Sequence, residues 1–323
     1  MSAEKIAFGD DFSCEKTFMK IAYYPGCTLK LQAKIFEDTA LAVAKHLGIE
    51  MVEMQNWNCC GTVSSLANDN LMHHIAPLRV LTRALKNGNK KLVTLCAVCW
   101  NTLKQSNELI KNGPDASIKL EKINSFLSDE KDEQINYNGE VEVLHFLEIL
   151  RDTRAGGGLE KISRNVQNPL NKKIAPYYGC LFTRPEKIAI DNKIEQPEIM
   201  SELISALGGE PIDFPYSVEC CGSYQTVNRP EIVSQKIQQI LDSAKEFGAE
   251  AVTVACPMCF YNLDKLQKGD TKIRILYFTE IIAEAFGLTG QNSEGGADTE
   301  RESPSSHSTG KTLNRKNAER ESR

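Results

Sequence analysis

The sequence lacks the features that would place it in a membrane, on nucleic acid or outside the cell. No apolar run approaches the ~20 residues that a membrane-spanning helix needs. The net charge of −5 lacks the basic excess typical of nucleic-acid-binding proteins. The stretch from Met1 to Lys20 has no apolar core of the kind found in signal peptides. We therefore predict no nucleic-acid partner, no direct membrane insertion and a cytoplasmic location.

The remaining composition is that of an ordinary globular protein with many cysteines. The chain has 323 residues, of which 41% are hydrophobic and 25% are charged. This length favours two domains with a substantial core. In a reducing cytoplasm, eleven cysteines favour metal ligands or redox groups over structural disulfides.

Ten of the eleven cysteines form two sets of five in the same order. Each set consists of a lone cysteine, then Cys-Cys-Gly, then Cys-x-x-Cys. The first set is Cys27, Cys59, Cys60, Cys96 and Cys99, and the second is Cys180, Cys220, Cys221, Cys256 and Cys259. The remaining cysteine, Cys14, has no partner motif around it, so we predict that it is functionally inert.

The residues around the cysteines repeat as well. The segment Ile21–Cys27 is restated as Ile174–Cys180, and each copy reads as a short strand that ends in a turn. The apolar segment Lys91–Cys96 is restated as Ala251–Cys256, and both copies are typical of a strand buried in a parallel sheet. The chain is therefore predicted to contain an internal duplication.

Amphipathic helices are predicted between these strands, over residues 31–47, 71–85 and 197–207. Alternating strands and helices predict an α/β fold made of two duplicated domains, each with a small parallel sheet. In such sheets, the loops after the carboxyl ends of the strands gather at one edge. Because each cysteine element follows a predicted strand, the five thiols of a set are expected to converge.

The composition also suggests where the domains begin and end. Residues 107–140 are polar and rich in Lys and Glu, and they read as a surface insertion. The last residues are charged and Ser-rich, with too little apolar surface to order themselves. We predict an N-terminal extension over 1–20, a first domain over 21–155 with an insertion at about 107–140, a linker over 156–170, a second domain over 171–289 and a disordered tail over 290–323.

Five thiols are an unusual number for one metal site. A single zinc ion takes four ligands, and an ordinary iron–sulfur cluster takes four cysteines. An unusual cluster with more than four protein ligands, or a bridging thiolate, is the natural interpretation. Adjacent cysteines can share one site only if the backbone bends, which Gly61 and Gly222 permit. The alternatives are zinc in one or both sites, a thioredoxin-like dithiol at a Cys-x-x-Cys, and buried structural cysteines.

The duplicated pattern resembles the CCG-domain family, which includes the B subunit of heterodisulfide reductase. In the two copies, 31 and 39 residues separate the lone cysteine from the Cys-Cys pair, and 35 and 34 residues separate the pair from Cys-x-x-Cys. The resemblance covers about residues 20–289 and all ten cysteines. It implies two noncubane [4Fe-4S] clusters. The ligands would be Cys27, Cys59, Cys60, Cys96 and Cys99 for the first cluster, and Cys180, Cys220, Cys221, Cys256 and Cys259 for the second.

The resemblance also implies an activity and partners. The activity is the reductive cleavage of a small disulfide of the CoM-S-S-CoB type between the two clusters. The implied partners are the ferredoxin-like C subunit and the flavin-containing A subunit of a heterodisulfide reductase complex. The alternative is an iron–sulfur electron-transfer or docking subunit of a lactate-, glycolate- or succinate-type oxidoreductase, which performs no disulfide chemistry.

No acid–base constellation accompanies the cysteines, so we predict no catalytic residue beyond the cluster ligands. His145 occupies the position that Tyr277 has in the second repeat, and we interpret it as a packing residue. Arg184 could meet an anionic substrate, but its position favours a surface arginine. The other side chains that we interpret as packing or solvated groups are His73, His74, Tyr23, Tyr24, Tyr177 and Tyr178.

Overall fold

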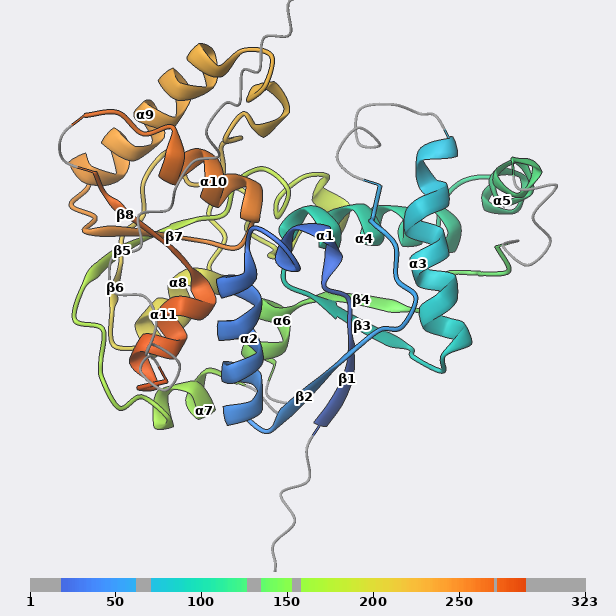
Figure 1. Cartoon of the computed structure of the whole chain (residues 1–323), viewed down its shortest axis with the longest axis horizontal. Helices are drawn as coiled ribbons and strands as arrows, with labels where there is room; N and C mark the ends of the chain where they lie inside the picture. Colours follow the sequence, from blue (N-terminus) through green and yellow to red (C-terminus); the bar gives the residue numbers. More distant parts are fainter. Residues whose placement is uncertain (1–18, 62–70, 127–134, 153–157, 270–271, 289–323) are drawn as a thin grey trace, which may run out of the picture. The chain divides into compact units, whose positions relative to one another are not determined.

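The computed structural model describes residues 19–61, 71–126, 135–152, 158–269 and 272–288 (Figure 1). Cys14, the rest of 1–18 and the predicted tail over 290–323 lie outside the described residues. The predictions made for them therefore stay predictions.

Strands and helices alternate along the described chain, as the sequence predicts. The first half contains β1 (Met19–Tyr23), α1 (Gly26–Leu29), α2 (Lys34–His46), β2 (Ile49–Glu53), η2 (Leu71–His74), α3 (Ile75–Lys86), β3 (Lys91–Thr94), α4 (Ala97–Lys111), α5 (Ala116–Ser125), β4 (Glu142–His145) and α6 (Phe146–Arg151). The second half contains α7 (Leu159–Arg164), β5 (Lys173–Tyr177), η5 (Glu186–Ile188), α8 (Ile199–Ala206), β6 (Glu210–Pro211), η6 (Ser223–Gln225), α9 (Pro230–Glu246), β7 (Ala251–Val254), α10 (Pro257–Lys265), β8 (Arg274–Tyr277) and α11 (Phe278–Ala285).

The two halves build parallel sheets with the same strand order. The first sheet runs β2-β1-β3-β4 and the second runs β6-β5-β7-β8. Ile21 pairs with Met51 and Ala22 with Leu92, and the strand pairs of both sheets are parallel. The prediction of two duplicated α/β units with small parallel sheets is confirmed. All carboxyl strand ends of one sheet therefore meet at one edge, which is where the cysteine loops begin.

The central strands form because their residues suit a sheet covered on both faces. All four residues of β7 are buried, and three of the four residues of β3 are buried. Helix α9 begins at Pro230, whose fixed φ suits the first turn of a helix. Its buried residues Val233, Ile237 and Ile240 recur at helical spacing and face the core.

The helix predicted over 31–47 differs from the structure at its start. Residues Gly26–Leu29 form the short helix α1, and α2 begins only at Lys34. Leu31 and Ile35 lie on the apolar face that helical spacing over 31–47 predicts, but they are 77% and 46% exposed. The buried face instead carries Phe36, Ala40 and Val43, among others, because α2 packs on α11 as well as on its own sheet.

The halves pack on each other through equivalent helices. Helices α2 and α8 follow the lone cysteine of their half, and α11 and α6 follow its last strand. Helix α2 contacts α11, and α8 contacts α6, so each half offers the same two helices to the other. The resulting interface has a pseudo-twofold relation between the halves.

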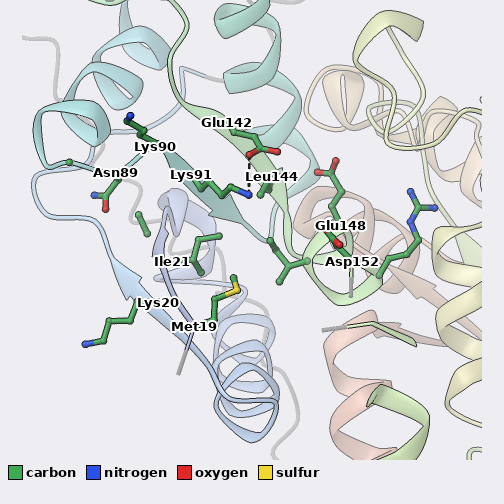
Figure 2. Close-up of a pocket in the computed structure, with 14 residues that line it drawn as sticks. Met19, Lys20, Ile21, Asn89, Lys90, Lys91, Glu142, Leu144, Glu148 and Asp152 are labelled. Carbon is green, nitrogen blue, oxygen red and sulfur yellow. Dashed lines mark ion pairs between the residues drawn. The ribbon is translucent and has the colours of Figure 1, made fainter. Parts of the chain in front are cut away.

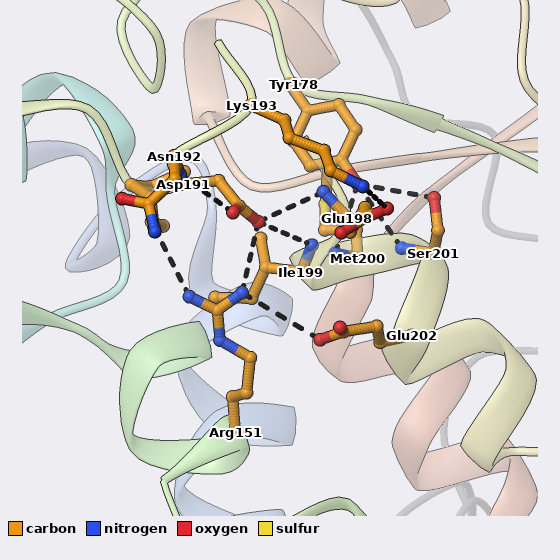
Figure 3. A network of polar contacts seen from close by, with 11 residues as sticks. Arg151, Tyr178, Asp191, Asn192, Lys193, Glu198, Ile199, Met200, Ser201 and Glu202 are labelled. Carbon is orange, nitrogen blue, oxygen red and sulfur yellow. Dashed lines mark hydrogen bonds and ion pairs between the residues drawn. The ribbon is translucent and has the colours of Figure 1, made fainter. Parts of the chain in front are cut away.

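Specific side chains join these helix pairs. The rings of Phe36 and Tyr277 stack with centroids 4.1 Å apart, and Thr39 Oγ1 lies 2.6 Å from Thr279 Oγ1. At the other pair, Arg151 Nη1 donates to Asp191 Oδ2 at 3.0 Å (Figure 3). Asp191 Oδ2 also accepts from two amides at the start of α8, so one carboxylate caps this helix and binds the opposite half.

Two further predictions concern the segments between the sheets. The range 156–170, predicted as a linker, contains α7, which contacts both α6 and α8. The predicted insertion over 107–140 contains the last turn of α4 and all of α5. The domain boundaries themselves stay predictions. Among the described residues, no helix is long and apolar enough to span a membrane.

Candidate functional site

The described elements bring the predicted cysteines to one edge of each sheet. In the first half, Cys27 lies in α1 just beyond β1, and the Cys59–Cys60 pair lies in the loop after β2. Cys96 is the N-cap of α4, which places Cys99 in the first turn of that helix. In the second half, Cys256 caps α10 in the same way.

The five thiols of each half form a row in which neighbours contact each other. The row begins at Cys27, whose Sγ lies 3.8 Å from Cys59 Sγ. The order of the first row is Cys27, Cys59, Cys60, Cys99 and Cys96. The order of the second row is Cys180, Cys220, Cys221, Cys259 and Cys256. In both halves the row runs from the lone cysteine through the Cys-Cys pair to the second and then the first cysteine of Cys-x-x-Cys.

The two rows meet where the halves meet. Cys96 shares a side-chain hydrogen bond with Cys256, and the amide of Ala97 donates to the carbonyl of Ala255 at 3.2 Å. Both cysteines are buried, with 4% and 5% of their surface exposed. The ten thiols therefore form one continuous row across both halves. The sequence carried no signal for this contact, because it depends on how the halves pack.

The outer ends of the row are the open ones. Cys27 is exposed, and Cys59, Cys180 and Cys220 are half-buried, whereas the other motif cysteines are buried. All ten are free thiols in the structure. Solvent and small solutes thus reach each row from the lone cysteine and from the first cysteine of the Cys-Cys pair.

Backbone amides point at the sulfurs in both halves. The amide of Gly222 donates to Cys220 Sγ at 3.3 Å, and the amide of Gly61 makes the equivalent bond to Cys59. Such N–H groups favour thiolate over thiol. Gly61 and Gly222 have positive φ, +91° and +77°, which a residue with a side chain rarely adopts. The predicted role of these glycines in bending the loop agrees with this geometry.

The crowding of the thiols opposes their simultaneous ionisation. The hydrogen bond from Cys60, and then that from Cys96, raise the pKa of Cys99 well above its usual range. The hydrogen bond with Cys220 raises the pKa of Cys221 to about 12, whereas Cys180 is the main cause that lowers the pKa of Cys220 to about 2. A bound metal cation relieves this repulsion, because a coordinating thiol loses its proton outright.

A second pair of glycines, which sequence reasoning missed, lies against the innermost thiols. Gly26 and Gly179 directly precede the lone cysteines and have φ of +70° and +64°. A Cβ on Gly26 would lie 2.9 Å from Cys99 Sγ, and one on Gly179 would lie 3.4 Å from Cys259 Sγ. The duplicated Gly-Cys sequence was the available signal. Gly26 needs glycine for the close approach as well as for φ, whereas at Gly179 the positive φ alone favours glycine.

The family model for the cysteine-rich domain (CCG) matches residues 21–104 and 174–264 of this chain. The chain belongs to the CCG family. The two matched segments span the first three strands of each sheet, without β4 and β8, and contain all ten motif cysteines, so each half carries one copy of the CCG pattern.

Relatives that are named for a function cover most of the CCG chain. An 8-methylmenaquinol:fumarate reductase membrane anchor subunit from Wolinella succinogenes is 27% identical over 83% of this chain and 93% of its own length. The B subunit of a ferredoxin/F(420)H(2)-dependent CoB-CoM heterodisulfide reductase from Methanosarcina acetivorans is 24% identical over 84% of this chain and 90% of its own length. A protein from Archaeoglobus profundus, named as similar to the heterodisulfide reductase B subunit, is 24% identical, with coverages of 88% and 96%.

The fold also occurs in a solved structure. A hypothetical protein from Helicobacter pylori superposes with a TM-score of 0.62 at 14% sequence identity. The match covers 83% of this chain but only 49% of that chain, and it supports the fold alone.

The CCG thiols do not form a preformed site for a single ion. Within the described residues, no three His, Cys, Asp or Glu side chains converge as ligands of one metal ion. The sulfurs instead stand in series, which suits a group of several metal atoms better than one tetrahedral ion. A cavity of about 930 Å³ lies away from the thiols, at the amino ends of β1, β3 and β4, between residues such as Lys91 and Glu142 (Figure 2). It shares no residue with the CCG motifs.

The remaining candidate residues behave as packing or surface groups. His145 is fully buried, and burial lowers its pKa to about 3, so the ring is neutral. Its Nε2 lies 2.7 Å from the carbonyl oxygen of Leu95 and donates to it. Arg184 is exposed, and His74 Nδ1 lies 2.8 Å from Ser106 Oγ. The predicted packing role of His145 agrees with these contacts.

Proposed function

We propose that this chain is the catalytic subunit of a heterodisulfide reductase-like complex, with a noncubane [4Fe-4S] cluster on each row of five thiols. The observation that carries the proposal is the contact between Cys96 and Cys256, which joins two complete five-thiol sets across the pseudo-twofold interface. Breaking one disulfide takes two electrons, whereas one iron–sulfur cluster usually transfers one. Two sets that face each other meet this requirement.

The donor set fits such a group. Each row offers five sulfurs, one more than a zinc ion or an ordinary iron–sulfur cluster takes. The first row also has a cradle that a Cβ would fill, at Gly26, where it would lie 2.9 Å from Cys99 Sγ. When bound, the clusters would supply the two electrons and iron atoms that accept the product sulfurs. The cluster ligands proposed are Cys27, Cys59, Cys60, Cys96 and Cys99, and Cys180, Cys220, Cys221, Cys256 and Cys259.

The chain's own residues would hold the ligands and admit the substrate. The exposed Cys27 and the half-buried Cys59, Cys180 and Cys220 would be the thiols that a small disulfide of the CoM-S-S-CoB type reaches first. No side chain beyond the ligands is assigned a catalytic role. The electrons would come from the ferredoxin-like and flavin-containing subunits of the complex. Ten free thiols need a reducing environment, so a cytoplasmic location is part of the proposal.

A second function is favoured by one comparison. The 27% identical relative is named as the membrane anchor of an 8-methylmenaquinol:fumarate reductase. The same ten thiols could therefore serve an electron-transfer or docking subunit of another CCG-type oxidoreductase, which leaves disulfides intact. The two proposals share the clusters and differ in the acceptor.

Anaerobically purified protein tests both proposals. We expect about four irons and four sulfides per row, and oxidation of a reduced viologen dye when the CoM-S-S-CoB disulfide is added. Two electrons and two protons should be consumed for each pair of thiols released. Full clusters with no thiol release, together with electron exchange with a menaquinone analogue, would favour the second function. Zinc without sulfide would exclude both.

A further inference from the structure

A tyrosine hydroxyl holds the peptide in front of each Cys-Cys pair. Tyr24 Oη donates to the carbonyl oxygen of Asn58 at 2.8 Å, and Tyr177 Oη donates to that of Glu219 at 2.6 Å. Both tyrosines stand three residues before the lone cysteine of their half, and both acceptors directly precede a Cys-Cys pair. The same bond is therefore built twice, although the accepting residues differ.

The ring of each tyrosine also lies next to the glycine that directly precedes the lone cysteine of its half. The ideal Cβ of Gly26, which would approach Cys99, would lie 3.6 Å from the ring of Tyr24. At Gly179, the corresponding distance to the ring of Tyr177 is 3.5 Å. One side chain thus contacts the segment of the lone cysteine through its ring and the loop of the Cys-Cys pair through its hydroxyl.

The environment keeps both hydroxyls protonated. Tyr24 and Tyr177 are 0% and 1% exposed, and burial followed by the neighbouring thiols raises the pKa of each hydroxyl. A neutral hydroxyl can donate a hydrogen bond to the carbonyl oxygen before the cysteine pair, whereas an ionised one cannot. Without it, the carbonyl before the cysteine pair would lose its buried partner, which costs more than the bond itself contributes.

We propose that Tyr24 and Tyr177 are positioning residues, which set the orientation of the Cys-Cys pair in the first and second site through one hydrogen bond each. They touch no reacting atom. Their effect passes through the peptide that leads into the two cysteines, whose sulfurs must turn toward one site. The inference rests on the proposed cluster binding and adds the residues that shape each ligand set.

Two neighbouring tyrosines serve as matched controls. Tyr23 Oη donates to Glu37 Oε1 at 3.2 Å, in α2. Tyr178 Oη accepts from the amides of Met200 and Ser201, in α8, at 3.2 and 3.3 Å. Both are buried, and both lose one hydroxyl in a Tyr→Phe variant, but neither hydroxyl bonds to a Cys-Cys-Gly loop.

The test compares Y24F and Y177F with Y23F and Y178F in the full chain, purified anaerobically. We expect Y24F to shift the midpoint potential of the first cluster alone and Y177F that of the second alone. Iron release to a chelator should become roughly fivefold faster at the affected site, as the loss of one hydrogen bond predicts. The control variants should keep the wild-type potentials and release rates.

A second readout does not need the clusters. Hydrogen–deuterium exchange should rise over 56–61 in Y24F and over 217–222 in Y177F, with no rise there in Y23F or Y178F. Unchanged exchange in these loops, or an equal rise in the controls, would overturn the inference. A wild-type chain without iron would instead overturn the proposed function, and the exchange data would still decide the role of the tyrosines.

Discussion

At the residue scale, glycine decides how closely the backbone approaches the thiols. Gly26 combines a left-handed φ of +70° with a position where a Cβ would lie 2.9 Å from Cys99 Sγ. Gly48 has nearly the same φ, +73°, but its Cβ would meet nothing within 4 Å. Alanine at Gly48 would therefore meet backbone strain alone, whereas alanine at Gly26 would meet the same strain and the contact with sulfur.

We predict that Gly26→Ala destabilises the protein more than Gly48→Ala. The left-handed backbone costs an alanine about 1–2 kcal/mol at either position. Gly26→Ala should cost about 1–3 kcal/mol more, because Cys99 must move in a packed core. Urea unfolding of both variants measures the difference, and iron analysis should show a loss at the first site of Gly26→Ala only. Equal costs and full iron in both variants would contradict a role for this contact.

At the element scale, the joints between the last strand and the last helix of each half share one feature. Glu148 Oε2 accepts from the amide of His145 before α6, and Glu280 Oε2 accepts from the amide of Tyr277 before α11. Only His145 also caps its helix with its side chain, which accepts from the amide of Leu147. His145 also donates to the carbonyl of Leu95, next to Cys96, so it joins the β4–α6 connection to the end of β3.

We predict that His145 makes stability depend on pH. Burial lowers its pKa from 6.5 to about 3 in the folded state. Below pH 6.5, the unfolded chain thus binds a proton that the folded chain does not, and stability falls as pH falls. Proton binding to His145 in the unfolded chain should lower the free energy of unfolding by about 1 kcal/mol between pH 8 and pH 5.5. His145→Asn keeps a side chain that can cap the helix and does not titrate, so its unfolding free energy should fall less over this range. Parallel curves for both proteins would contradict the prediction.

The elements that the sequence specifies locally were predictable. The apolar segments before Cys96 and Cys256 are buried central strands, and the motif cysteines follow strand ends because parallel sheets place them there. The buried face of α2 was not predictable, since Phe36 is buried through its stacking on Tyr277 of the other half. Periodicity in one helix carries no information about a partner helix that comes far later in the chain.

The candidate site was predictable as a list of cysteines but not as an arrangement. Duplicated order and spacing identify the ten cysteines, whereas the contact between Cys96 and Cys256 depends on the packing of the halves. The hydroxyl bonds of Tyr24 and Tyr177 were missed for another reason. Their acceptors are backbone carbonyls, which every residue has, so no residue type in the sequence indicates them.

At the scale of the whole molecule, the pseudo-twofold packing makes the innermost thiols of the two sites neighbours. The described residues up to Leu288 behave as one compact unit, with α2 on α11 and α6 on α8. Such packing brings the first cysteine of each Cys-x-x-Cys against its counterpart in the other half, whereas each lone cysteine contacts a thiol of its own row. A change at an inner cysteine should therefore reach both sites, and a change at an outer cysteine only one.

We predict that Cys96→Ser alters the second site as well as the first, whereas Cys27→Ser alters the first alone. Cys96 is hydrogen-bonded to Cys256, and replacing its sulfur changes the charge and the polar contact next to Cys256. Cys27 is exposed, and within the described residues its nearest thiol contact is Cys59 of its own row. Potentiometric titration of each variant, followed by electron paramagnetic resonance, should show a shifted potential for the second cluster in Cys96→Ser only. The reciprocal pair, Cys256→Ser and Cys180→Ser, should shift the first cluster in Cys256→Ser only. An unchanged midpoint potential of the second cluster in Cys96→Ser would mean that the two sites act separately.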